Sequence, residues 1–75
     1  MTNEEREYLK KVAAMAFSLS PVLTNRIRQI APYGVSESDC YVQMLEDILA
    51  NRPLTAENLE SSKALLKEQL GLSTV

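Results

Sequence analysis

Four helix-start signals divide the chain into segments of similar length. Each is a Ser or Thr whose side-chain oxygen can accept hydrogen bonds from the open N–H groups of a first helical turn. Glu5 and Asp39 complete capping-box patterns with the first and third signals, and Pro21 suits a first helical position because that position needs no N–H donor. The signals stand at Thr2, Ser20, Ser36 and Thr55.

Residues that interrupt helical geometry mark where these segments end. A proline disfavours helical geometry in the residue before it, and Pro32 and Pro53 each follow a segment with helical periodicity. Gly71 can adopt the left-handed conformation of a C-cap, with Leu72 folded back onto the last turn. The sequence therefore predicts helices over residues 3–19, 21–31, 37–50 and 56–70.

No segment alternates polar and apolar residues as a strand does, and no repeat or long linker divides the 75 residues. A chain of this length forms one domain with a thin core. Short connections place successive helices side by side and roughly antiparallel. We therefore expect an all-α fold, a small bundle of four short helices spanning residues 1–75.

Apolar residues at helical spacing indicate which faces form the core. In the first helix, Tyr8, Val12, Met15 and Leu19 make a stripe that Leu9, Ala13 and Ala16 widen, and Phe17 falls outside it. We expect this stripe to fill the interior and Phe17 to contact a second neighbour, either another helix of the same fold or another molecule. The other expected core positions are Leu23, Ile27 and Ile30; Tyr41, Val42, Met44, Leu45, Ile48 and Leu49; and Leu59, Leu66 and Leu70.

Reactive side chains are scarce. The chain has no His, and its single Cys40 follows the third helix-start signal, where Val35 can pack onto it as a hydrophobic staple. A nucleophile without a neighbouring base is a poor catalyst. Asp39 and Glu46 share a helical face, but no Gly-containing loop accompanies them as in a calcium site. We expect no catalytic residue, no cofactor and no metal.

The net charge is only −2, and its distribution is uneven. Residues 12–35 carry only Arg26 and Arg28, whereas residues 36–51 carry only acidic charges. One interpretation is complementary charge between neighbouring helices, and the other is an acidic face that docks a basic partner. Residues 21–50 could also form a DNA-binding helix-turn-helix. The charge argues against it, because Glu37 and Asp39 would place carboxylates beside the DNA phosphates.

The N-terminal residues lack the basic and apolar regions of a secretory signal peptide. The longest apolar run, Val12–Phe17, is far shorter than the ~20 residues that span a bilayer. One cysteine cannot form an intramolecular disulfide, which suits a reducing compartment. We expect a cytoplasmic protein with no membrane segment.

Apolar residues make up 45% of the chain, more than so small a core readily buries. The leading hypothesis is a non-enzymatic protein-binding module, a small adaptor, regulator or inhibitor of the kind that phages and mobile elements often encode. The alternative is a structural assembly or virion-connector subunit, and a homodimer fits either. The candidate partner-binding residues are Phe17, Tyr33 and Leu65, with the charged residues Arg26, Arg28, Asp39 and Glu46.

Overall fold

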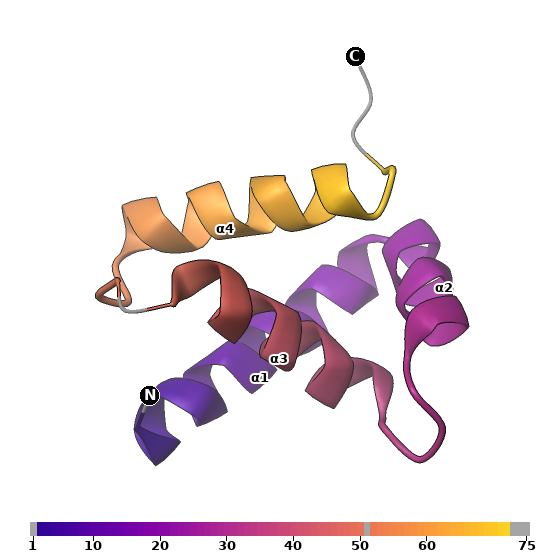
Figure 1. Cartoon of the computed structure of the whole chain (residues 1–75), viewed down its shortest axis with the longest axis horizontal. Helices are drawn as coiled ribbons and strands as arrows, with labels where there is room; N and C mark the ends of the chain where they lie inside the picture. Colours follow the sequence, from indigo (N-terminus) through magenta and orange to yellow (C-terminus); the bar gives the residue numbers. More distant parts are fainter. Residues whose placement is uncertain (1, 51, 73–75) are drawn as a thin grey trace.

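The computed structural model describes residues 2–50 and 52–72, and it contains four helices joined by short connections (Figure 1). No strand occurs in this part of the chain. The predicted all-α class is confirmed, and each helix begins and ends within one residue of its predicted position. The helices are α1 (Asn3–Leu19), α2 (Pro21–Ile30), α3 (Glu37–Leu49) and α4 (Ala56–Gln69).

The predicted caps explain why the helices begin where they do. In the capping box of α1, the N–H of Glu5 donates to Oγ1 of Thr2 at 3.1 Å, and the N–H of Thr2 donates to Oε1 of Glu5 at 3.0 Å. Ser20, Ser36 and Thr55 each accept from the N–H three residues further on. Replacing such a cap by alanine typically costs about 1 kcal/mol.

Helix α3 is the centre of the fold, because it packs against all three other helices. Figure 1 shows α3 between α1 and α4, while α2 turns steeply away from α1 instead of running back alongside it. The expectation of antiparallel neighbours is therefore wrong for α2. Antiparallel helical hairpins use loops of about 2–5 residues, and Ser20 alone separates α1 from α2.

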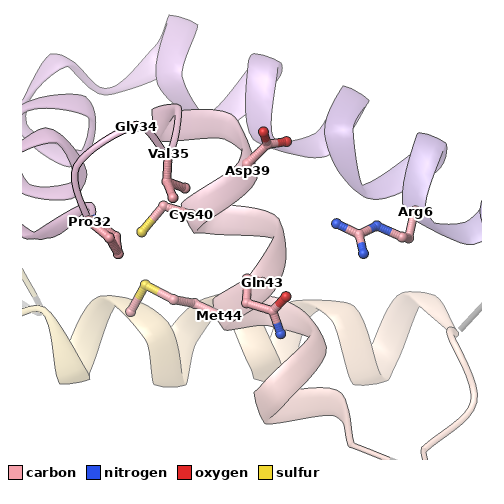
Figure 2. A pocket seen from close by; sticks show the side chains of 8 residues that line it. All are labelled: Arg6, Pro32, Gly34, Val35, Asp39, Cys40, Gln43 and Met44. Carbon is pink, nitrogen blue, oxygen red and sulfur yellow. The ribbon is translucent and has the colours of Figure 1, made fainter.

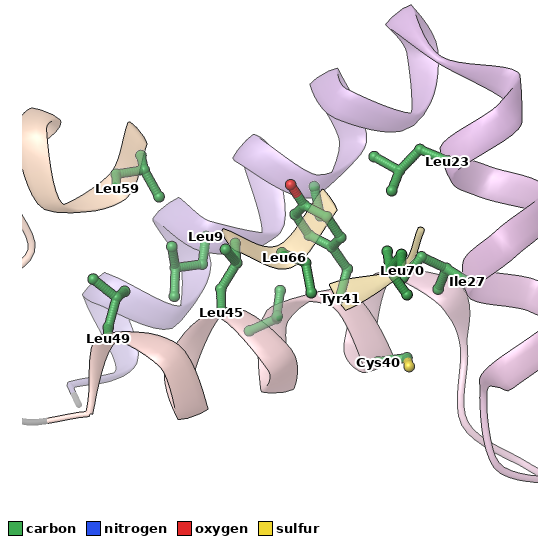
Figure 3. Packing of buried hydrophobic residues seen from close by; sticks show 12 residues of the cluster. Leu9, Leu23, Ile27, Cys40, Tyr41, Leu45, Leu49, Leu59, Leu66 and Leu70 are labelled. Carbon is green, nitrogen blue, oxygen red and sulfur yellow. The ribbon is translucent and has the colours of Figure 1, made fainter. Parts of the chain in front are cut away.

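The buried core is built mainly around α3 (Figure 3). Most of its predicted apolar arc is buried, including Tyr41 and Leu45, and so are the predicted positions on α4. On α2 the prediction fails at Ile30, which is 45% exposed near the end of its helix. The buried cluster comprises Leu9, Ala13, Leu23, Ile27, Cys40, Tyr41, Val42, Leu45, Leu49, Leu59, Leu66 and Leu70.

Only one side of the apolar stripe predicted for α1 faces the interior. Leu9 and Ala13 are fully buried, whereas Tyr8, Met15 and Leu19 are 50%, 67% and 79% exposed. The prediction that these three residues fill the core is wrong. Helix α3 packs on the side of α1 that holds Leu9 and Ala13, and one closely packed helix covers only part of so wide an apolar arc.

Phe17, on the other side of α1 from Met15, has its second neighbour within the fold. It is partly buried against the core, with its ring edge-on to that of Tyr41 at a centroid distance of 5.4 Å and an interplanar angle of 69°. Such an aromatic pair contributes about 0.5–1.5 kcal/mol beyond the burial of its area. Of the two neighbours expected for Phe17, another helix of the fold and another molecule, the structure shows the first.

The C-terminal end of α4 is closed as predicted. Gly71 has φ +74°, its N–H donates to the carbonyl of Glu68 at 3.1 Å, and the N–H of Leu72 donates to that of Lys67 at 2.9 Å. These two bonds form a Schellman motif. The Leu72 side chain packs against the core. Backbone hydrogen bonds and a side-chain contact therefore both stabilise the last turn of α4.

One buried polar group on α4 has no evident partner. The side chain of Ser62 is fully buried, and its hydroxyl forms no hydrogen bond to any described residue. A buried hydroxyl without a partner costs about 1–3 kcal/mol.

Candidate functional site

Large apolar side chains form a line along the outer side of α1. We call Tyr8, Val12, Met15 and Leu19 the α1 stripe. They follow one another four, three and four residues apart, so they share one helical face. Three of the four are at least half exposed. Val12 packs partly against the core, and the rest of the stripe is an apolar helix face that the other described residues leave largely uncovered.

A groove of about 400 Å³ lies beside the stripe, between α1 and α4. Both helices pack mainly on α3, and they scarcely touch each other. Space therefore remains between their outer sides, and we call it the α1–α4 groove. It is lined by Tyr8, Lys11, Val12, Met15, Ala16 and Leu19 from α1 and by Leu59, Glu60 and Lys63 from α4.

Charged groups stand only at the edges of the α1–α4 groove. On α4, Nζ of Lys63 lies 3.2 Å from Oε1 of Glu60. On α1, Lys11 is exposed and has no ion-pair partner among residues 2–50 and 52–72. Lysine stems cover apolar surface while their ammonium groups remain in water. The groove therefore combines an apolar floor with two cations and one anion at its edges.

A second hollow, of about 490 Å³, lies on the other side of α3 near the turn that follows α2 (Figure 2). It contains the thiol of Cys40, whose pKa is raised because burial disfavours the thiolate. A protonated thiol is a weak nucleophile and a weak metal ligand. Val35, the other member of the predicted staple, lines the same hollow. The lining residues are Arg6, Pro32, Gly34, Val35, Asp39, Cys40, Gln43 and Met44.

The predicted partner-binding residues are scattered over the molecule. Tyr33 is fully exposed in the turn between α2 and α3, and Leu65 is 42% exposed on α4. Arg26 is exposed on α2, and Asp39 is exposed at the edge of the second hollow. None of the predicted partner-binding residues lines the α1–α4 groove.

Two of the predicted charged residues form ion pairs inside the molecule. Nε of Arg28 lies 2.9 Å from Oε1 of Glu37, and Nε of Arg6 lies 3.4 Å from Oε1 of Glu46. The hydrogen bond from Arg28 lowers the pKa of the Glu37 carboxyl group. These pairs join α3 to α2 and to α1, which fits complementary charge between neighbouring helices. Arg28 and Glu46 are therefore occupied within the fold.

Sequence reasoning missed the α1 stripe because it assigned these residues to the core. The signal that could have found them is side-chain size. Along the broad apolar arc of α1, the side that includes Ala13 and Ala16 is mostly small, and the side that includes Tyr8, Met15 and Leu19 is large. A single helix packed closely on α1 covers only part of so wide an arc.

No known protein family, curated protein or solved structure matches the chain. Within the described residues, no cluster of His, Cys, Asp and Glu could hold a metal ion. None of the described helices is both long enough and apolar enough to cross a membrane. Function is therefore argued from the geometry of the α1 stripe and the α1–α4 groove.

Proposed function

We propose that this protein is a small non-enzymatic binding module, an adaptor, regulator or inhibitor, that docks a protein partner on the α1 stripe. One observation carries the proposal: α1 turns Leu9 and Ala13 inward and leaves the large apolar side chains of Met15 and Leu19 in water. Full burial of a large apolar side chain stabilises by about 1.5–3 kcal/mol. A contiguous apolar patch that forgoes this gain typically marks an interaction site.

In this mechanism Met15 and Leu19 are the anchors that enter the partner, because the centre of an interface carries most of its binding energy. The charged edge of the α1–α4 groove sets register and the rate of encounter. We place the protein in the cytoplasm, since a reducing compartment keeps the buried Cys40 as a thiol. Tyr33 and Leu65 lie outside this surface and are not needed for it.

The test is affinity capture with three matched baits: the wild-type chain, Met15→Asp and Leu65→Asp. Met15 and Leu65 are both exposed apolar helix residues, but only Met15 lines the groove. We expect a partner that the wild type and Leu65→Asp retain and that Met15→Asp loses, with unchanged circular dichroism for all three. An identical set of captured proteins for the three baits would contradict the proposal.

Native mass spectrometry of the isolated chain separates the proposal from its alternative. A binding module is expected as a monomer or a dimer. One high and fixed number of copies, abolished by Met15→Asp, would instead favour a structural assembly or virion-connector subunit that uses the α1 stripe to join copies of itself.

A further inference from the structure

We infer that the occupant of the α1–α4 groove is an amphipathic helix whose apolar face is flanked by acidic residues. The inference rests on the proposed function and specifies the partner's chemistry at the same site. Three features carry it, namely the spacing of the α1 stripe, the small extent of the groove and the charge at its edges.

The spacing of the stripe matches that of a helix–helix contact. Apolar residues four, three and four apart form the seam that one helix presents to another in a coiled coil or a helix-in-groove complex. Leu59 on α4 faces the same groove as Met15 on α1. A helix laid between α1 and α4 would therefore pack on both and cover the exposed side of the stripe.

The extent of the groove favours a single helix over a folded surface. Nine residues line it, whereas a standard interface between globular proteins uses about 20–30 residues on each side. A second copy docking face to face would need a much larger contact than the groove offers. The side chains along one face of a single helix match the size of this groove.

The charge at the edges favours acidic flanks. The whole chain has a net charge of −2, yet the groove has Lys11 on α1 and Lys63 on α4 against Glu60 alone. Lys63 has three N–H donors and one ion pair, so it can still donate to another carboxylate. Acidic flanks on the occupant would meet a cation on each side of the groove, Lys11 on α1 and Lys63 on α4.

The experiment measures fluorescence anisotropy of two designed helical peptides, each as long as α1, against the full chain. Both carry leucines at the spacing of the stripe, and their flanking positions are all Glu in one peptide and all Lys in the other. We expect the acidic peptide to bind roughly five- to tenfold more tightly. This order opposes the net charge of the chain, so a non-specific charge effect would give the reverse.

Variants locate the effect. Lys11→Glu with Lys63→Glu should reverse the preference, while Arg26→Glu with Arg52→Glu, which changes the net charge equally at two exposed positions outside the groove, should keep it. Met15→Asp should abolish binding of the acidic peptide, and Leu65→Asp should leave it unchanged.

Each contrary outcome would refute one part of the inference. Equal affinities for the two peptides would refute the acidic flanks. If neither peptide binds while a captured protein still depends on Met15, the helical occupant is refuted and the proposed function stands. A dimer of the chain alone that Met15→Asp dissociates would identify a second copy as the occupant and overturn the inference.

Discussion

Helices α1 and α3 both have broad apolar arcs, but they use them differently. The arc of α3 is buried or partly buried along its length, because α3 has all three other helices around it. The arc of α1 is divided, with Ala13 turned inward and Met15 turned outward. In this fold, the number of helices packed around an amphipathic helix, more than its apolar content, determines how much of it is buried.

Shortening one large side chain in each helix should give the largest difference in stability between α3 and α1. Leu45→Ala in α3 should lower the free energy of unfolding by about 2–5 kcal/mol, because it leaves a cavity in the core. Met15→Ala in α1 should change it by no more than about 0.5 kcal/mol, since the side chain already lies in water. Urea unfolding followed by circular dichroism measures both, and similar losses would contradict the division of the α1 arc.

Enlarging the small inward residue tests why α1 presents that face to the core. Ala13→Leu should cost about 1–3 kcal/mol, because the buried contact has no room for added methylene groups. The control is Ala14→Leu, one residue along on the exposed side of the same helix. The same unfolding experiment applies. Equal stability of the two variants would show that the core beside Ala13 has room for a larger side chain.

A serine pair on α4 tests how strictly the core around α3 excludes polar groups. Ser62→Ala removes a buried hydroxyl that has no partner among the described residues, and it should raise the free energy of unfolding by about 1 kcal/mol or more. Ser61→Ala, at an exposed position of the same helix, gains only a few tenths from helix propensity. If both gains were equal in thermal and urea unfolding, the Ser62 hydroxyl would have a hydrogen-bond partner in solution.

The smallest expected effect is the pH dependence of the ion pair that joins α2 to α3. Because Arg28 lowers the pKa of Glu37 below its ordinary 4.5, the unfolded chain binds more protons between the two values. The stabilisation is therefore complete above pH 4.5 and is lost as the pH falls through the lowered pKa. Melting temperatures across this range should fall less in Glu37→Gln than in the wild type.

Arg28→Gln provides the check on this assignment. It removes the other half of the pair, so it should reduce the acid dependence of the melting temperature in the same way. A wild-type acid dependence in both variants would place the acid sensitivity elsewhere in the molecule.

The helix bounds could be predicted because their causes are local. Thr2 and Glu5, three residues apart, form reciprocal hydrogen bonds, and Gly71 ends α4 through its own left-handed backbone conformation. The core of α3 was predictable for a similar reason, since a helix with polar residues confined to one side has only one face to bury.

The candidate site could not be predicted in the same way. The choice between the face with Ala13 and the face with Met15 depends on the shape that α3 brings to the contact, with Tyr41 and Leu45 in the interior. That shape is set by residues some thirty positions away, so a window along α1 does not contain it. The second neighbour of Phe17 was left open for the same reason, because its partner ring belongs to Tyr41.

The one-residue corner at Ser20 has a mechanical consequence. Its N–H donates to the carbonyl of Ala16 and so completes α1, while its hydroxyl accepts from the N–H of Leu23 and so starts α2. Oγ1 of Thr24 braces the bend through the carbonyl of Phe17. A change in the angle between α1 and α2 would strain these hydrogen bonds. Displacement of Leu19 at the end of α1 is therefore expected to displace the start of α2 as well.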